Sequence, residues 1–151
     1  FPGHFLVKVT LPEGLVVLDP LTGQSLGLER LSEQLLPFRN RTEDAEDADT
    51  PLGLYLQPAT PRDILTRMLR NLKEIFSSQT DWPRLKCVLD RLIVLNPDAL
   101  FERRDRGLAC IEMGLNEQAR DDLNVYVSQA NSASDVDLIR ARLASLESDR
   151  A

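Results

Sequence analysis

The side chains best suited to chemistry are His4, the only histidine of the chain, and Asp19. A Leu-Pro-Glu-Gly stretch separates two runs rich in Val and Leu, at 5–10 and 15–19, which indicates an antiparallel β-hairpin. If 10–13 form a four-residue loop, His4 lies opposite Asp19, with Cβ atoms roughly 5 Å apart. A histidine oriented by a carboxylate is the base half of a nucleophile-base-orienter triad. The alternative, which the spacing alone favours, is a pair that merely closes the hairpin end.

The nucleophile of such a triad is missing from the chain, because no cysteine precedes His4. The two cysteines, Cys87 and Cys110, lie in strongly helical patterns, where we expect both to be small buried apolar side chains. Two cysteines make no disulfide framework, which is typical of reduced thiols in a cytoplasmic protein. We therefore expect this chain alone to be catalytically inert, with no cofactor and no metal site.

The composition excludes several classes of partner. Hydrophobic residues make up 42% of the 151 residues and charged residues 28%, which is typical of a protein with a real core. The apolar runs are too short for a membrane span. A net charge of −6 argues against general binding to nucleic acid or to anionic membranes.

The start of the chain indicates that neighbouring structure is needed. It has neither an initiator methionine nor a signal peptide, and we expect an N-terminal part of the natural protein to be missing. The run 15–18 is continuously apolar, so both of its faces should be covered, and an isolated hairpin cannot supply that cover. The cover would come from the missing N-terminal unit or from a second copy, which makes a homodimer through the exposed hairpin a further hypothesis.

Three short segments follow the hairpin. Residues 28–36 are predicted to form an amphipathic helix that ends at Pro37. Residues 39–51 hold five acids and are predicted to form a surface loop, with a partner-binding tail as the alternative. Residues 52–56 could add one more strand.

Residues 61–77 are predicted to form a long amphipathic helix, since their apolar side chains recur at helical spacing. On its polar side, Asp63 with Arg67 and Arg70 with Glu74 are four residues apart and could pair. The residues expected to cap this helix and to begin the four later ones are Thr60, Asp81, Asp98, Asn116 and Ser134.

The helical half repeats with a period of 34 residues. Shifting the chain by this period aligns Lys73 with Gly107, Phe76 with Cys110, Leu85 with Ala119, Leu89 with Leu123 and Leu92 with Tyr126. This pattern resembles the tetratricopeptide repeat, with units at 66–99 and 100–133, and the last helix would be the polar cap of a short solenoid. Some positions depart from the pattern, namely Lys73, Leu85, Arg103, Arg106 and Asn131.

Five sequence blocks together resemble the bacterial transglutaminase-like, tetratricopeptide-repeat proteins of the SirB type. The blocks are FPGHFLVKV, LDP at 18–20 with Gly23, RMLRNLK at 67–73, LDRLIVLNP at 89–97 and RDRG at 104–107. The resemblance implies a mainly α fold, with a partial transglutaminase-like or papain-like β-rich unit at 1–60 before a helical repeat domain at 61–151. The family's catalytic order is Cys, His, Asp, so the resemblance implies that His4 and Asp19 are base and orienter. The chain would then be the C-terminal part of a cysteine acyltransferase or amidase.

The resemblance also implies a protein-interaction module, because tetratricopeptide repeats present the first helix of each pair on a peptide-binding surface. Here that surface would carry Arg67, Arg70, Asn71, Phe101, Arg104 and Asp105. Arginines suit the carboxylates of a protein or peptide partner. The alternative, which we favour for the arginines, is that they pair with Glu74, Glu102 and Asp105 or dock the helices onto the β-rich unit. Binding of nucleic acid by the cluster Arg103, Arg104 and Arg106 is the weakest hypothesis.

Overall fold

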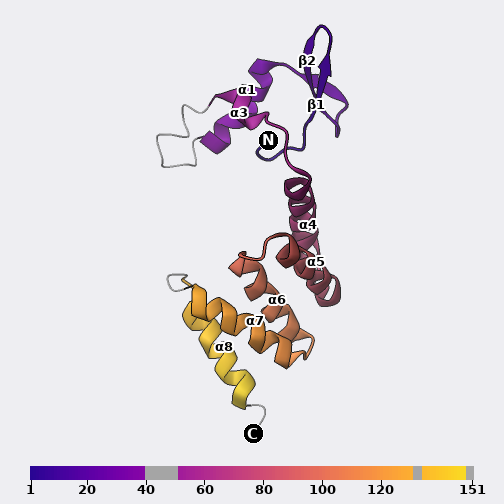
Figure 1. Cartoon of the computed structure of the whole chain (residues 1–151). Coiled ribbons are helices and arrows are strands. Elements are labelled where there is room, and N and C mark those ends of the chain that lie inside the picture. The colour runs from indigo at the N-terminus through magenta and orange to yellow at the C-terminus, as the bar shows by residue number, and fades with distance from the viewer. Residues whose placement is uncertain (40–50, 131–133, 149–151) are drawn as a thin grey trace. The chain divides into compact units, whose positions relative to one another are not determined.

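The computed structural model describes residues 1–39, 51–130 and 134–148. In this part of the chain three strands precede the helices, and the fold divides into two compact units, Phe1–Ala59 and Thr60–Ala151 (Figure 1). The expectation of a mainly α fold with helical repeats after a small β-rich part is confirmed. The predicted acidic loop at 39–51 lies almost entirely outside the described residues.

The first unit contains a three-stranded antiparallel sheet of order β1-β2-β3, formed by β1 (Val7–Leu11), β2 (Gly14–Asp19) and β3 (Gln24–Leu26). The hairpin is confirmed, but the predicted four-residue loop is wrong, because Leu11 pairs directly with Gly14. Gly14 has a φ of 144°, which glycine adopts without strain, so the turn shrinks to two residues. The register shifts by two residues from the predicted one, and β3 was not predicted.

Two helices pack beside this sheet, and both differ from the sequence prediction. Helix α1 (Leu28–Arg39) continues through Pro37 instead of ending there, although proline has no backbone N–H to donate to the preceding turn. The segment predicted as a strand is the short helix α3 (Leu52–Tyr55). A small apolar cluster contains the buried Val17, Leu26 and Leu31, with partly buried side chains packed against it: Phe1, Leu6, Leu52 and Leu56.

The second unit is a row of five helices in which each packs against the next. They are α4 (Pro61–Ser78), α5 (Trp82–Leu95), α6 (Leu100–Glu112), α7 (Asn116–Gln129) and α8 (Val136–Ser148). Thr60 and Asp81 cap α4 and α5 as predicted, but Asp98 does not cap α6, which starts after Ala99 without a side-chain cap. The two helix pairs and the final helix therefore follow the predicted order.

The 34-residue period corresponds to the packing of the core. The buried pairs at this spacing are Leu85 and Ala119, Leu89 and Leu123, and Leu92 and Tyr126. At Gly107 a Cβ atom would lie 2.7 Å from the Leu123 side chain, so α6 and α7 approach closely only because this residue is glycine. The small residues of the second repeat are thus explained by helix packing.

Candidate functional site

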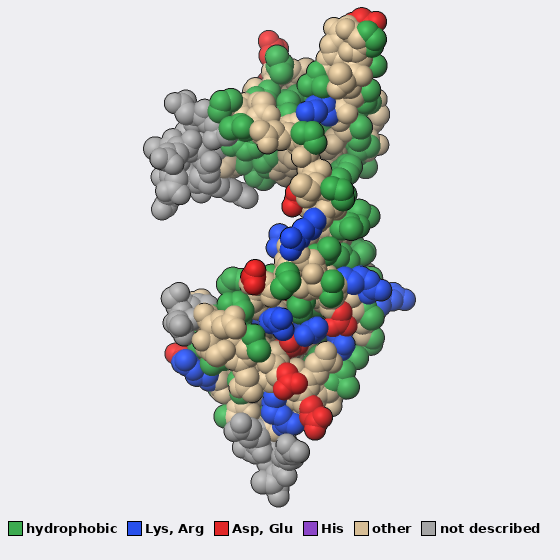
Figure 2. Space-filling view, viewed as in Figure 1, with side chains coloured by type: hydrophobic (Ala, Val, Ile, Leu, Met, Phe, Trp, Pro, Cys, Tyr) green, Lys and Arg blue, Asp and Glu red, His purple; other side chains and the backbone are tan. Residues whose placement is uncertain are grey.

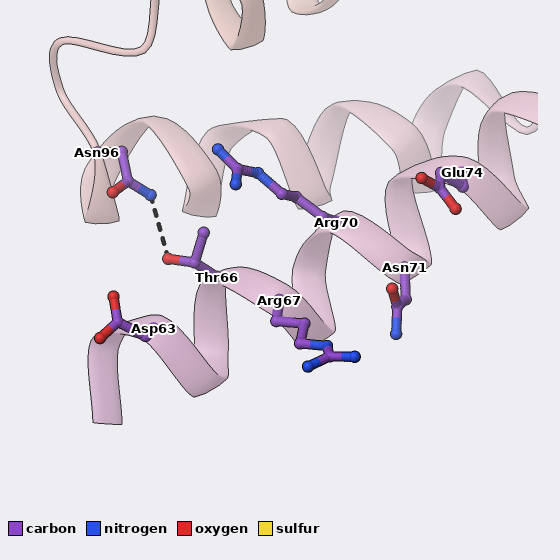
Figure 3. A pocket seen from close by; sticks show the side chains of 7 residues that line it. All are labelled: Asp63, Thr66, Arg67, Arg70, Asn71, Glu74 and Asn96. Atoms are coloured by element: carbon purple, nitrogen blue, oxygen red, sulfur yellow. Dashed lines mark hydrogen bonds between the residues drawn. The ribbon is translucent and has the colours of Figure 1, made fainter. Parts of the chain in front are cut away.

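A polar pocket of about 520 Å³ lies in the helical unit (Figure 3). Six of its lining residues come from α4, and the seventh is the residue that ends α5: Asp63, Thr66, Arg67, Arg70, Asn71, Glu74 and Asn96. Three of the four binding residues proposed from the sequence, Arg67, Arg70 and Asn71, therefore line one pocket. Arg104 does not line it.

The helix α4 brings these side chains together because residues three and four positions apart share a face. Its first turn is fixed by a capping box, in which the Asp63 amide donates to the Thr60 hydroxyl at 3.2 Å and the Thr60 amide donates to the Asp63 carboxylate at 3.1 Å. Hydrogen bonds from Thr60 hold the pKa of Asp63 below its ordinary value. The Asp63 carboxylate is thus engaged in the hydrogen bonds that cap the start of the helix.

Two of the residues that line the pocket, Thr66 and Asn96, are joined by a hydrogen bond (Figure 3). The amide nitrogen of Asn96 donates to the buried hydroxyl of Thr66 at 3.1 Å. An asparagine amide has two donors and a carbonyl acceptor, so this bond uses only part of what Asn96 offers. The two residues are 30 positions apart, and nothing in the sequence pattern joined them.

Arg70 connects the pocket to α6. Its Nε lies 3.5 Å from the Oε1 of Glu102, one of the internal partners that the sequence suggested for the arginines, and its side chain is 57% exposed. A guanidinium has five N–H donors in a planar fork, so the contact with Glu102 leaves donors for a ligand. Arg70 can therefore hold the helices together and still contact a bound molecule.

Glu102 is almost fully buried, and its negative charge is compensated by an ion pair with Lys73. The Lys73 ammonium lies 2.5 Å from carboxylate oxygens of both Glu102 and Asp105. Burial alone would lower the pKa of Lys73, but the hydrogen bonds from its ammonium to Asp105 and Glu102 outweigh burial and raise it. Lys73, which departs from the repeat pattern, thus links α4 to α6 through ion pairs.

Arg104 makes its contacts within the helical unit. Its guanidinium pairs with Asp105 at 2.7 Å and with Asp135 at 2.6 Å, and it lies over the ring of Phe101, 5.2 Å from the centroid. The Tyr126 hydroxyl donates to the other oxygen of Asp135 at 2.5 Å. These contacts agree with the internal pairing that the sequence allowed as the alternative to ligand binding.

His4 and Asp19 are not paired across the hairpin. His4 lies three residues before β1, and Asp19 lies opposite Gln24 of β3. Asp19 accepts a hydrogen bond from the Leu21 amide at 2.8 Å, which is the main reason its pKa is lowered, and the charge of His4 adds a smaller effect in the same direction. The prediction that strand pairing places His4 opposite Asp19 is therefore wrong. His4 nevertheless contributes to lowering the pKa of Asp19.

Comparison with protein families follows the division of the fold. Residues 1–70 match the transglutaminase-like superfamily, and residues 72–144 match the tetratricopeptide repeat. Over nearly the whole chain it is similar to protein SirB1 of Salmonella typhimurium, at 23% identity over 144 residues that cover 95% of this chain and 51% of that protein. The resemblance to the SirB-type proteins is confirmed.

Other SirB-type relatives belong to the same group of UPF0162 proteins. The UPF0162 protein of Xylella fastidiosa is 37% identical over 151 residues, covering 99% of this chain and 53% of that protein. YchA of Escherichia coli is 24% identical over 146 residues, covering 95% of this chain and 51% of that protein. The chain thus spans about half the length of the curated relatives it matches. No solved structure matches it.

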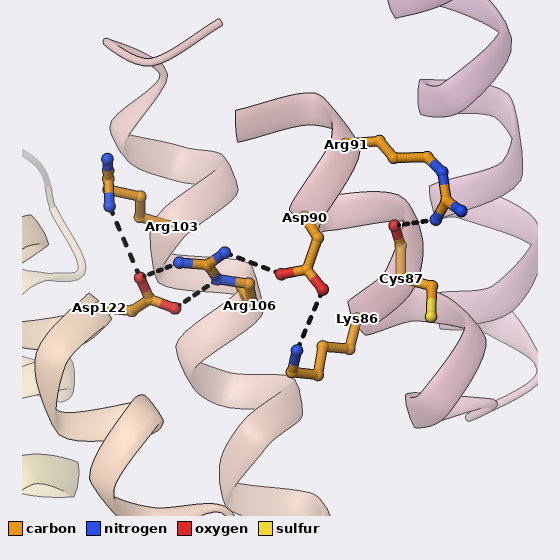
Figure 4. Close-up of polar contacts among 7 residues, drawn as sticks. All are labelled: Lys86, Cys87, Asp90, Arg91, Arg103, Arg106 and Asp122. Carbon is orange, nitrogen blue, oxygen red and sulfur yellow. Dashed lines mark hydrogen bonds and ion pairs between the residues drawn. The ribbon is translucent and has the colours of Figure 1, made fainter. Parts of the chain in front are cut away.

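A second polar network, which the sequence did not predict, joins α5, α6 and α7 (Figure 4). Arg106 binds Asp122 through Nε at 2.6 Å and Asp90 through Nη1 at 2.8 Å. Arg103 lies 3.8 Å from Asp122, and Lys86 lies 3.0 Å from Asp90. Arg103 and Arg106, which depart from the repeat pattern, are thus explained by ion pairs inside the helical unit.

The two cysteines have different surroundings. Cys110 is buried as expected, and burial raises the pKa of its thiol. Cys87 is exposed, so the prediction that it is buried was wrong, because it lies on the outer side of α5. Within the described residues, no group of three or more His, Cys, Asp and Glu side chains could hold a metal ion. In the same part of the chain no helix combines the length and the apolar character needed to cross a bilayer.

Proposed function

We propose that the helical unit is a protein-interaction module whose pocket beside α4 binds an acidic peptide segment. The observation that carries the proposal is the set of donors along one pocket: two guanidinium groups, from Arg67 and Arg70, and two amides, from Asn71 and Asn96. A guanidinium fork matches a carboxylate in a bidentate pair, and an amide can both donate to and accept from a peptide backbone. The match to the tetratricopeptide repeat over 72–144 supports a protein partner.

The acidic residues of the pocket do not cancel its preference for an acidic peptide. Asp63 accepts hydrogen bonds from Thr60 in the capping box, which engages its carboxylate. Glu102 is not among the residues that line the pocket, and it forms ion pairs with Lys73 and Arg70. Glu74 is the remaining carboxylate of the pocket, at the end where the bound peptide would present a neutral or basic residue. A peptide with one acidic group near Arg67 and Arg70 therefore suits the pocket.

The proposal can be tested with Arg67→Ala and Asn71→Ala, measured by fluorescence anisotropy with labelled peptides selected from an acidic library. Loss of one charge-assisted hydrogen bond costs about 1.5–3 kcal/mol, so we expect affinity to fall by roughly tenfold or more. The matched control is Arg140→Ala, since Arg140 is an exposed arginine of α8 that pairs with Asp137. Equal affinity of the two arginine variants would contradict the proposal.

The second candidate function belongs to the complete protein: a cysteine acyltransferase or amidase to which this chain contributes His4 and Asp19. The match of residues 1–70 to the transglutaminase-like superfamily supports it. The test is labelling of the complete protein with a thiol-reactive acyl probe, compared between the natural protein and its His4→Ala variant. Labelling that does not depend on His4 would remove this candidate.

We further propose a cytoplasmic location and a homodimer formed through the hairpin. Both cysteines are free thiols, which suits a reducing compartment. Strand β1 is at the edge of the sheet, and most of its residues are exposed. An edge strand presents unpaired backbone groups to which a second copy can add a strand.

A further inference from the structure

Thr66 is a buried polar residue among those that line the pocket. It is 9% exposed, whereas the side chain of Arg70, one turn later in α4, is 57% exposed. A buried hydroxyl costs free energy unless it is hydrogen-bonded, and the side-chain nitrogen of Asn96 donates to this one at 3.1 Å (Figure 3). The side chain of threonine is restricted at χ1 in a helix. Thr66 therefore offers Asn96 an acceptor whose position is well defined.

Asn96 is held by its main chain as well as by its side chain. It is the residue that ends α5, and its backbone N–H donates to the Leu92 carbonyl at 2.8 Å. Its backbone carbonyl accepts from the Ala99 amide at 3.1 Å. Together with the bond to Thr66, these contacts orient the side-chain amide before any ligand arrives. A group that is already ordered loses less conformational entropy when it binds.

The Asn96 amide has further hydrogen-bonding groups to offer in the pocket. The bond to Thr66 takes one N–H, which leaves the second N–H and the carbonyl oxygen. A residue of an extended peptide directs its own N–H and C=O to the same side of the chain, as hydrogen-bonded pairs do in an antiparallel sheet. A side-chain amide can donate to that C=O and accept from that N–H. An arginine only donates, so it cannot accept from a peptide N–H.

We propose that Thr66 is a positioning residue, which holds the Asn96 amide so that it binds the main chain of a peptide in the pocket. The inference rests on the proposed function and deepens it, because it makes the ligand an extended polypeptide segment instead of any small carboxylate. Arg67 and Arg70 supply the preference for an acidic group, and Figure 2 shows basic side chains on the surface of α4. Asn96 supplies a contact that does not depend on the side chains of the peptide.

The test is an ester scan of a peptide selected from the acidic library, in which each peptide unit in turn is replaced by an ester and so loses its N–H. Fluorescence anisotropy with the unmodified chain should show one position at which the ester weakens binding by about three- to tenfold, the effect of one neutral hydrogen bond. Thr66→Val keeps the shape of the side chain and removes the hydroxyl. It should weaken the parent peptide by a similar factor and abolish the sensitivity to that ester.

Two further variants control for packing. Thr66→Ser keeps the hydroxyl, so it should retain both the affinity and the sensitivity to the ester. Asn96→Ala changes a half-buried residue instead of a buried one, and it should abolish the sensitivity without disturbing the core. The ratio of affinities for the acidic peptide and its glutamine counterpart is a separate readout. Thr66→Val should leave this ratio unchanged, whereas Arg67→Ala should reduce it.

Three outcomes would overturn the inference. The first is unchanged peptide affinity of Thr66→Val with an unchanged circular dichroism spectrum. The second is a Thr66→Ser variant that binds as weakly as Thr66→Val, which would assign the effect to packing. The third is an ester effect that persists in Thr66→Val and in Asn96→Ala.

Failure of the proposed function would look different. An unmodified chain that binds the acidic peptide and its glutamine counterpart equally would contradict the preference for acids, and the ester scan would still decide the role of Asn96. Absence of binding to every peptide of the library would overturn both proposals.

Discussion

At the scale of the residue, the helical unit is held together by carboxylates that are buried with their counter-charges. Glu102 and Asp122 are the buried acids, and each meets two cations, Lys73 with Arg70 and Arg106 with Arg103. Removing one partner from such a pair leaves a charge without solvent, which costs more than the pair itself contributes. These ion pairs therefore help to specify how α4, α6 and α7 meet.

The variant Arg106→Ala tests this account of the polar network. Because Asp122 would keep its charge at 3% exposure, we expect the free energy of unfolding to fall by about 3–5 kcal/mol. Urea unfolding followed by circular dichroism at 222 nm measures it. The control, Arg140→Ala, removes an exposed pair and should change stability by about 0.5 kcal/mol or less. Equal effects of the two variants would contradict the role given to Arg106.

The pH dependence of stability follows from three other acids. Hydrogen bonds hold the folded-state pKa of Asp63 and Asp135 below the ordinary value near 3.8, and those from Lys86 and Arg106 outweigh burial for Asp90. As the pH falls, the unfolded chain therefore binds protons before the folded one does.

The contribution of these three carboxylates to stability is at its full value above pH of about 4. It declines as the pH falls through their folded-state pKa values, which are lower than the unfolded ones. Thermal unfolding between pH 2 and pH 7 should show this. Asp63→Asn, which can still accept from Thr60, should reduce the decline. A decline that is unaltered by this change would contradict the contribution assigned to Asp63.

At the scale of the element, close helix packing in the second repeat depends on Gly107. We expect Gly107→Ala to destabilise the helical unit by about 1–3 kcal/mol, because its Cβ would overlap the Leu123 side chain. The control is Gly53→Ala, where a Cβ would meet no atom within 4 Å. Thermal unfolding of both variants measures the difference. If Gly107→Ala left thermal stability unchanged, α6 and α7 would be able to separate at little cost in free energy.

The sequence predicted helices better than strands, and the reasons are local. Helix α4 carries its own capping box and amphipathic period, so its bounds agree within one residue with the prediction. The hairpin register depended on whether Leu11 and Gly14 pair, which the φ of one glycine decides. The segment Leu52–Tyr55 is too short for periodicity to separate strand from helix.

The candidate site was predicted in part for a similar reason. Arg67, Arg70 and Asn71 share a face of one helix, so spacing alone could group them. Asn96 enters the pocket through its bond to Thr66 across 30 residues, and Arg104 leaves the site because Asp135 and Asp105 bind it. Polar contacts between residues of different helices were not readable from the periodicity.

At the scale of the whole molecule, the edge strand β1 is the surface proposed for self-association. A second copy pairing with β1 antiparallel about Val9 would place Val7 opposite Leu11 and Lys8 opposite Thr10, with no like charges facing. We expect a concentration-dependent dimer in sedimentation velocity. Thr10→Pro, which removes a backbone donor that faces away from β2, should shift the chain to a monomer. A monomer at all concentrations would contradict the dimer proposal.

The central claim is that the pocket beside α4 binds carboxylate-bearing peptides. The most direct measurement is an NMR titration of the arginine Nε–H and asparagine side-chain amide signals, with an acidic peptide and its glutamine counterpart. The account predicts that Arg67, Arg70, Asn71 and Asn96 shift with the acidic peptide and hardly move with the neutral one. Shifts of equal size with both peptides, or shifts confined to other helices, would contradict it.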